Sequence, residues 1–255
     1  LKNMTPEKTF KILSENVFPF LQNLGGDGST YSKHMKGARF TINAPRLLTK
    51  AIDLLDQIPM EDRDTKGDLY EYMLSKLQSA GQNGQFRTPR HIIRLMVELT
   101  GPTSKDTICD PASGTCGFLI NASEYLRAVY PEILSNKKTR AHFHNTMFSG
   151  YDSDNTMLRI GSMNMLLHGI ENPNITYRDS LSEDFALEEE KYSLILANPP
   201  FSGSIDIDNA AKNLLDVVNT ESTELLFIAL FLKLLKIGGR AAVIVPDGVL
   251  FKANN

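Results

Sequence analysis

The sequence has few cysteines and no excess of basic residues, and both absences narrow the functions it can have. Its two cysteines, Cys109 and Cys116, form no CxxC pair and imply no disulfide framework, which fits a reducing cytoplasm. Lys and Arg number 27 against 30 Asp and Glu, for a net charge of −3. A stand-alone nucleic-acid binder usually has a basic surface, so any action on nucleic acid would need a partner that supplies much of the binding.

Long apolar runs and metal-binding clusters are also missing from the sequence. The longest strongly apolar run, Leu225 to Leu232, is far too short to cross a bilayer. No set of Cys, His and carboxylate residues has the spacing of a metal site. We therefore expect a cytoplasmic protein with neither a membrane span nor a bound metal.

The pattern of apolar residues changes near residue 80. Before it, apolar residues recur at helical spacing over 44–58 and 67–78. After it, strands and helices alternate, which is typical of a doubly wound, mostly parallel α/β sheet with helices on both faces. We divide the chain into a helical region, 1–80, and a sheet domain, 81–255. Because the chain ends soon after the last predicted strand, we expect this domain to be truncated at its carboxyl end.

Glycine, proline and capping residues mark the predicted elements. Thr88 is expected to cap a helix over 88–100, with Pro89 at its first position. An apolar helix is expected over 223–239, ending at glycine. Two segments are expected to be loops, 24–37 and a surface insertion at 131–145. The predicted strands are 106–110, 147–152, 174–179, 192–198 and 240–246.

The segment "CDPASGTCGFL", 109–119, follows the first predicted strand and opens a helix. Gly114 and Gly117 allow a tight turn and the close approach of a ligand, although an ordinary strand-to-helix loop also contains such glycines. No Lys follows them, as a phosphate-binding P-loop requires, and the pattern is not GxGxxG. Asp110, at the strand end, suits a positively charged amino acid group better than a pyrophosphate. These residues favour S-adenosylmethionine over NAD.

Two further acids follow the next two predicted strands. Asp152 ends the second strand, where a carboxylate can bind the two hydroxyls of a ribose. Asp179 follows the third strand, where it could accept a hydrogen bond from an adenine amino group. Each acid alone could be a helix cap or a solvated loop residue. Three acids at three successive strand ends indicate a ligand site more strongly than any one of them.

The fourth predicted strand stops at "NPPF", Asn198 to Phe201. A simple turn would explain the two prolines, which lack an N–H and end a strand. A second interpretation is a binding site for an amine, because the Asn198 side-chain oxygen and the Pro199 carbonyl can accept both hydrogens of an exocyclic amino group. The nitrogen lone pair would then be free to attack a sulfonium methyl group. Pro200 restricts the turn, and Phe201 offers a face on which a flipped base can stack.

These motifs together resemble those of the adenine-N6 DNA methyltransferases. "GQFRTPR", 84–90, is similar to their amino-terminal cofactor motif, and "DPASGTCGFL" and "NPPF" follow in the order of the gamma group. With "GDLYEYML" and "GGRAAVIVPDGVLF", almost the whole chain resembles the modification subunit of type I restriction–modification systems. The resemblance implies that 81–255 is an S-adenosylmethionine-dependent catalytic domain that methylates adenine in DNA.

The resemblance also implies roles for single residues. Phe86, Thr88 and Pro89 are expected to hold the methionine end of the cofactor, and Glu71 is a further candidate for cofactor contact. The remaining cofactor residues are Asp110, Pro111, Gly114, Gly117, Asp152 and Asp179, and the target base is assigned to Asn198, Pro199, Pro200 and Phe201. The chain departs from the family pattern at Cys116, where a glycine or another very small residue is usual, and at Arg87, where a second aromatic residue is common.

Subunits of this family act with partners. The resemblance implies a specificity subunit that reads the DNA, a restriction subunit and a second modification subunit, with 1–80 available for partner or DNA contacts. The basic segment 136–140 could touch phosphates or be a solvated loop. Two alternatives stay open. The chain could methylate a protein glutamine or an RNA amine, although those enzymes usually have Tyr at the position of Phe201, or it could be a cofactor-binding scaffold without activity.

Overall fold

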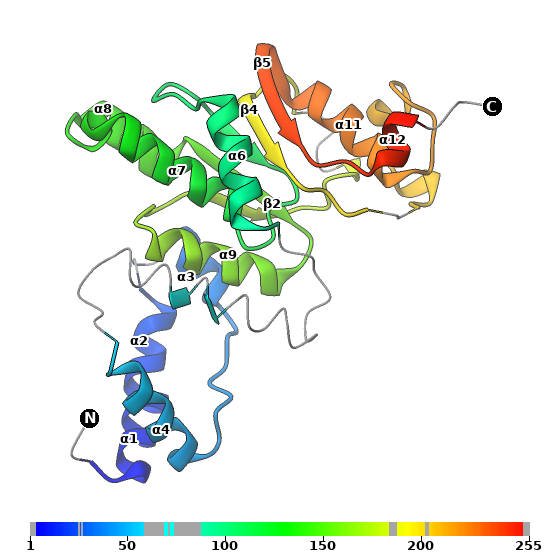
Figure 1. Cartoon of the computed structure of the whole chain (residues 1–255). Coiled ribbons are helices and arrows are strands. Elements are labelled where there is room, and N and C mark those ends of the chain that lie inside the picture. The colour runs from blue at the N-terminus through cyan, green and yellow to red at the C-terminus, as the bar shows by residue number, and fades with distance from the viewer. Residues whose placement is uncertain are drawn as a thin grey trace.

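A five-stranded parallel sheet with the strand order β3-β2-β1-β4-β5 forms the centre of the molecule (Figure 1). The computed structural model describes residues 4–24, 26, 28–58, 69–70, 72–73, 88–183, 188–201 and 204–251. From β1 the chain adds β2 and β3 on one side of the sheet, and it then crosses back to add β4 and β5 on the other side of β1. This strand order confirms the predicted doubly wound parallel architecture. The strands are β1 (Ile108–Asp110), β2 (Phe148–Asp152), β3 (Asn174–Tyr177), β4 (Tyr192–Ala197) and β5 (Leu235–Val243).

Helices cover both faces of this sheet, as the alternation of strands and helices predicts. The described α-helices are α1 (Pro6–Ile12), α2 (Phe18–Gln22), α3 (Thr30–Met35), α4 (Pro45–Leu55), α6 (Arg90–Thr100), α7 (Gly117–Val129), α8 (Lys137–Asn145), α9 (Asn155–Leu167), α10 (Lys212–Leu215), α11 (Thr223–Leu234) and α12 (Asp247–Phe251). The described residues also form short helical turns: the π-helical η1 (Leu13–Val17) and the 3₁₀ turns η2 (Pro131–Leu134) and η4 (Ile207–Asn209).

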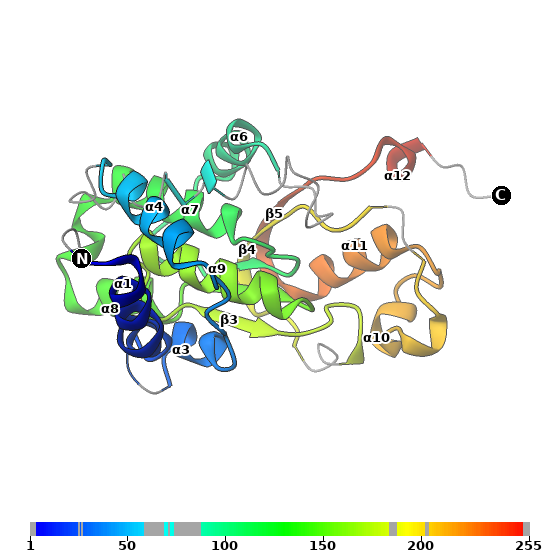
Figure 2. The same cartoon turned by 90° about the horizontal axis from the view of Figure 1, so that it is seen from below.

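The alternation of side chains along β1 shows how the two layers form. Ile108 is fully buried in a core shared with α6, α7, α8 and α9, whereas Cys109 is fully buried in a second core shared with α10 and α11. In Figure 2, α7, α8 and α9 accordingly lie to one side and α10 and α11 to the other. Successive residues of a strand face opposite sides, so a strand between two helical layers must be apolar throughout. The run of buried residues in β4 has this origin.

The helices of the first part of the chain extend away from the sheet (Figure 1). Helix α1 packs against α4, and α3 packs against α9. The predicted loop over 24–37 was wrong, because it contains α3, whose first turn is capped by the Ser29 hydroxyl. Tyr31 and Met35 are buried against Met163 and Leu166 of α9, so this short helix gains its stability from tertiary packing.

Two further local predictions were wrong for similar reasons. The segment 131–145 is not a surface insertion: it forms η2 and α8, whose first turn is capped by the Asn136 side chain. Ile133 and Phe143 from this segment are buried in the main core. The helix expected over 223–239 ends at Leu234, because β5 begins at the next residue and pairs with β4.

One further prediction concerns residues that are only partly described. The helix predicted over 67–78 lies mostly outside the described residues, and within it 69–70 and 72–73 are helical. None of the helices in the described ranges combines the length and apolar character needed to cross a membrane.

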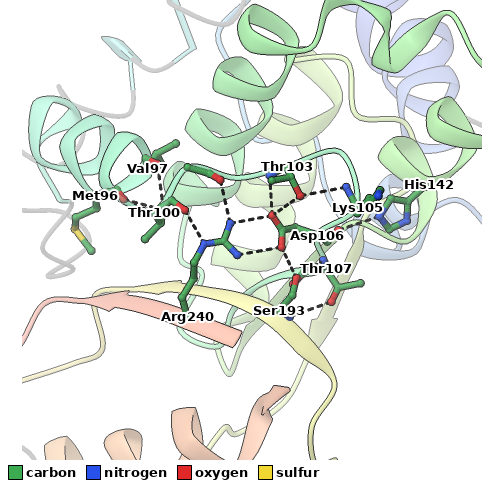
Figure 3. Close-up of polar contacts among 11 residues, drawn as sticks. Met96, Val97, Thr100, Thr103, Lys105, Asp106, Thr107, His142, Ser193 and Arg240 are labelled. Atoms are coloured by element: carbon green, nitrogen blue, oxygen red, sulfur yellow. Dashed lines mark hydrogen bonds and ion pairs between the residues drawn. The ribbon is translucent and has the colours of Figure 1, made fainter. Parts of the chain in front are cut away.

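Arg240 of β5 binds both the end of α6 and the segment that precedes β1, near the edge of the sheet where the strands begin (Figure 3). Its Nε donates to the Thr100 carbonyl at 2.6 Å, and its Nη2 donates to the Gly101 carbonyl at 3.1 Å, so that it holds the carboxyl end of α6. Its Nη1 and Nη2 also bind the two carboxylate oxygens of Asp106, at 3.2 and 2.9 Å. Asp106 accepts further hydrogen bonds from Ser193 of β4 and from the Thr103 backbone.

Replacing Asp106 with asparagine should destabilise the protein at neutral pH and less so at pH 3. Burial raises the pKa of Asp106, but hydrogen bonds from Arg240, Ser193 and Thr103 outweigh burial and lower this pKa to about 2. A carboxylate with a depressed pKa stabilises the fold above its unfolded pKa of about 4, and this contribution is lost as the pH falls towards 2. We expect Asp106→Asn to lower the free energy of unfolding by about 2 kcal/mol at pH 7.

Urea denaturation at pH 7 and pH 3 measures this effect, with Asp53→Asn on the exposed face of α4 as the matched control. The control should stay within about 0.5 kcal/mol of the parent protein. An equal loss for Asp106→Asn at both pH values would show that its carboxylate charge does not contribute to stability.

Candidate active site

The predicted site residues that the structure describes meet at the edge of the sheet where the strands end. Asp110 is the last residue of β1 and pairs with Gly150 of β2, two residues before Asp152. On the other side, β1 and β4 are in register at Cys109 and Ile195, so that Asn198 follows β4 at the same edge. Parallel strands end together, and ligands of doubly wound sheets bind outside these ends. Phe86, Glu71 and Arg87 lie outside the described residues.

The glycine loop between β1 and α7 is held down by the two strand-end acids. Gly114 has a φ of +48° and donates its N–H to Asp152 Oδ2 at 2.9 Å, and Ala112 donates its N–H to Asp110 Oδ1 at 3.1 Å. Asn164 of α9 also holds the loop, because its Nδ2 donates to the Thr115 carbonyl oxygen at 2.9 Å. The loop thus has a defined shape set by side chains from β1, β2 and α9.

Gly117 has a packing reason to be glycine in addition to its predicted role. It is the first residue of α7, and a Cβ atom at this position would lie 3.2 Å from Cδ1 of Ile93 in α6. The absence of a side chain therefore lets α6 and α7 approach closely. Its contact with a cofactor stays a prediction.

Both strand-end acids have raised pKa values. Asp110 is only 1% exposed, and its burial, together with the neighbouring Asp152 charge, raises its pKa to about 8 against the opposing hydrogen bond from Ala112. Burial is also the main reason why the pKa of Asp152 is raised. Among the described residues, no Lys or Arg makes an ion pair with either carboxylate. A cationic ligand group would stabilise the charged form of Asp110, which is costly to bury alone.

Asp179 lies two residues beyond β3 and is exposed. Its Oδ1 accepts from the Leu181 N–H at 3.1 Å, which forms a local turn. The next residue, Ser180, donates its hydroxyl proton to the Pro111 carbonyl and ties this turn to the glycine loop. Pro111 is thereby placed between the loop and the end of β3, and the roles of Asp179 and Pro111 towards a ligand stay predictions.

Asn198 presents one satisfied and one unsatisfied polar atom. Its Nδ2 donates to Thr88 Oγ1 at 2.9 Å, whereas its Oδ1 is buried and, among the described residues, accepts no hydrogen bond. The turn that follows passes from the buried Pro199 to the exposed Pro200, and Phe201 is 40% exposed. A buried carbonyl oxygen without a donor costs about 1–3 kcal/mol, and a ligand N–H group at this position would remove that cost. The unsatisfied Oδ1 is what the predicted amine-binding role requires.

Thr88 meets Asn198 because it is not the helix cap that its sequence suggests. Helix α6 begins at Arg90, and Pro89 occupies the capping position with an extended ψ of 137°. The prediction that Thr88 caps the helix and that Pro89 is its first residue was therefore wrong by one position. The Thr88 hydroxyl is left free of the helix and turns towards Asn198.

Cys116 takes the left-handed conformation in which glycine is usual. It has a φ of 62°, and it is fully buried. Room for its side chain comes from Gly161 of α9, where a Cβ atom would lie 2.7 Å from Cys116 Sγ and 3.0 Å from the Gly114 carbonyl oxygen. An isolated glycine inside a helical pattern is the sequence signal that could have revealed this contact.

We expect Gly161→Ala to destabilise the protein by about 1–3 kcal/mol, because the added methyl group overlaps Cys116 and the glycine loop. The double variant Gly161→Ala with Cys116→Gly removes the clash with sulfur and should recover part of this loss. A double-mutant cycle from thermal or urea denaturation measures the coupling. Additive effects would show that Gly161 does not serve to accommodate Cys116.

Comparison with known proteins agrees with this geometry. Residues 61–255 match the family model described as N-6 DNA Methylase. The chain is 32% identical over 260 residues to the EcoEI methylase subunit of a type I restriction enzyme from Escherichia coli. This alignment covers 98% of this chain and 52% of that protein.

Two solved structures have the same architecture. A modification subunit assigned to a type I restriction enzyme from Vibrio vulnificus YJ016 superposes with a TM-score of 0.75 at 28% identity, covering 93% of this chain and 52% of the other. A chain from a structure that describes the assembly and conformational transition of the type I restriction–modification system gives a TM-score of 0.73 at 26% identity. The superposition covers 98% of this chain and 52% of the other.

The chain thus spans about half the length of these relatives. The resemblance inferred from "DPASGTCGFL" and "NPPF" is confirmed by the match over most of the sequence. Together, the parallel sheet, the motif order and the family match show that this chain belongs to the N-6 DNA methylase family.

Proposed function

We propose that this chain carries out methyl transfer from S-adenosylmethionine to the N6 amine of adenine in DNA, as part of a type I modification subunit. The observation that supports this most directly is the buried, unsatisfied Oδ1 of Asn198, at the same sheet edge as Asp110. An amine hydrogen is the donor that this oxygen lacks, and Asp110 offers a buried carboxylate to a cationic ligand group.

The residues at the strand ends fit S-adenosylmethionine. Asp110 has no cationic partner among the described side chains, and burial raises its pKa, so a positive group beside it would stabilise its charged form. The Asp152 carboxylate is suited to the ribose hydroxyls, and Asp179 is suited to the adenine amine of the cofactor. When bound, this cofactor supplies an electrophilic methyl group. The further cofactor contacts proposed from family resemblance are Phe86, Thr88, Pro89, Pro111, Gly114 and Gly117.

Asn198 and Pro199 prepare the target nitrogen. Their two carbonyl oxygens would accept the two amine hydrogens, which draws the nitrogen lone pair out of conjugation with the ring. No strong base is needed before transfer, because a proton can leave the nitrogen afterwards. Phe201 has an exposed face for stacking against the base, and Pro200 restricts the turn that carries it. A base in duplex DNA must first be flipped out of the helix.

Partners would supply the sequence recognition. The net charge of −3 argues against strong DNA binding by this chain alone. We propose a complex with a specificity subunit, a restriction subunit and a second modification subunit. Residues 1–80 are proposed for contacts with partners or DNA, since α2 and α4 expose Phe20, Leu47 and Leu54.

The test is transfer of a labelled methyl group to adenine-containing DNA by this chain, with and without a specificity subunit. Labelled N6-methyladenine that depends on the specificity subunit would support the proposal. Label in protein glutamine or in RNA, with none in DNA, would favour the alternative amino-methyltransferase. Cofactor binding without transfer to any of these substrates would favour a scaffold.

A further inference from the structure

The Asn198 amide has two orientations that are not equivalent for catalysis. Rotation of the amide by 180° exchanges its oxygen acceptor with its nitrogen donor. In the orientation observed, Nδ2 faces Thr88 at 2.9 Å and Oδ1 is the buried atom left for a ligand. In the opposite orientation, an N–H group would face the amine of the target base, and two donors would oppose each other. Only the first orientation can hold an amine in the way that the proposed function requires.

The partner that faces this amide does not choose between the two orientations by itself. A threonine hydroxyl both accepts and donates, so Thr88 can bind either the nitrogen or the oxygen of Asn198. What decides is where the single hydroxyl proton of Thr88 goes. If another acceptor takes that proton, the Thr88 oxygen can only accept, and Asn198 must turn its Nδ2 towards it.

We infer that Thr88 is a positioning residue that sets the Asn198 amide when the cofactor binds. Its hydroxyl donates to the carboxylate of the cofactor's amino acid part and accepts from Asn198 Nδ2, so that Asn198 Oδ1 is directed to the target amine. This inference rests on the proposed function, and it adds an order: the cofactor prepares the base-binding group before the base arrives.

The surroundings of Thr88 are suited to this task. Thr88 precedes α6, whose far end is held by Arg240 through the Thr100 and Gly101 carbonyls (Figure 3). The position of Asn198 is held by β4, in which the Ala197 carbonyl accepts from the Ile244 N–H at 3.0 Å. Rigid elements thus bring the two side chains together across 110 residues of sequence. Rotation of the Asn198 amide then decides which of its two polar atoms faces Thr88.

The first experiment compares hydroxyl-bearing and hydroxyl-free variants in single-turnover methyl transfer to DNA. Thr88→Val keeps the side-chain shape but removes the hydroxyl, and we expect the rate constant at saturating cofactor to fall by about 10- to 100-fold. Thr88→Ser keeps the hydroxyl and should stay within about threefold of the parent protein. Thr100→Val, at the other end of α6, removes a hydroxyl that donates to the Met96 and Val97 carbonyls of its own helix, and it should leave the rate unchanged.

A second experiment needs no turnover. The affinity for adenine-containing DNA is measured with S-adenosylhomocysteine, which has the amino acid carboxylate, and with methylthioadenosine, which lacks it. The parent protein should bind DNA more tightly with the first ligand than with the second, and Thr88→Val should remove this difference. Thr88→Ala, the less bulky hydroxyl-free variant, should behave in the same way, and thermal melting confirms that each variant is folded.

The outcomes separate this inference from the proposed function. A parent protein that transfers no methyl group to DNA overturns the proposed function. A parent protein that is active, with Thr88→Val raising only the KM for the cofactor at an unchanged rate constant, shows that Thr88 is a cofactor contact alone and overturns the inference. Equal DNA affinity with both ligands in the active parent protein overturns it as well.

Discussion

Replacing Asn198 with alanine is expected to lower the rate constant for methyl transfer by about 10³-fold, the size of effect seen when one preorganised polar group is removed from an active site. The fold should be nearly unaffected. The substitution loses one hydrogen bond to Thr88, worth about 1 kcal/mol, but it also removes a buried oxygen that has no donor, which recovers a similar amount. A large loss of activity with little loss of stability is the signature expected of a group kept for catalysis.

Single-turnover transfer of a labelled methyl group, calorimetric titration with S-adenosylmethionine and thermal melting together measure these effects. The matched control is Asn213→Ala, an asparagine of α10, which belongs to the helical layer on the face of the sheet opposite to α6. It should leave the transfer rate unchanged. Activity of Asn198→Ala within about tenfold of the parent protein would exclude the proposed role of its oxygen.

Replacing Asp152 with alanine should weaken the binding of S-adenosylmethionine by about 100-fold, because charge-assisted hydrogen bonds contribute about 1.5–3 kcal/mol each. Asp152 has two functions here. It is proposed to bind the ribose, and it accepts the Gly114 N–H at 2.9 Å and the Asp154 N–H at 2.8 Å, which shapes the glycine loop. Alanine removes both functions, whereas asparagine keeps one acceptor oxygen and should lose less.

The pH dependence of binding gives a second measure of the same residue. Burial raises the pKa of Asp152, so its carboxylate takes up a proton at a higher pH than an ordinary aspartate does. Cofactor binding by the parent protein should therefore weaken as the solution is made acidic, and this dependence should be smaller in Asp152→Asn. The control is Asp154→Ala, which removes the cap of α9 and should cost about 1 kcal/mol of stability at most, without a change in affinity. Equal affinity of Asp152→Ala and the parent protein would refute the ribose assignment.

Much of the architecture was accessible from local patterns. Apolar periodicity indicated α4, the glycine loop indicated the start of α7, and short apolar runs bounded by glycine, proline or acids indicated the strands. These signals work because a strand buried on both faces needs apolar residues throughout, whereas an amphipathic helix needs apolar residues along one face only. Predictions failed where a short segment gains its stability elsewhere, as α3 does from α9 and α8 from the main core.

The sequence by itself determined the order of the chemical groups: an acid and a glycine loop after β1, acids after β2 and β3, and an asparagine with two prolines after β4. Parallel topology then requires that these groups lie at one edge. Only the tertiary structure decided how their atoms are used. Thr88 binds Asn198 and is not a helix cap, and Asp152 accepts the Gly114 N–H. Gly161 leaves room for the side chain of Cys116. The reason is physical: periodicity and turn chemistry act over a few residues, whereas the direction of a hydrogen bond and the room for a side chain depend on segments that are distant in sequence.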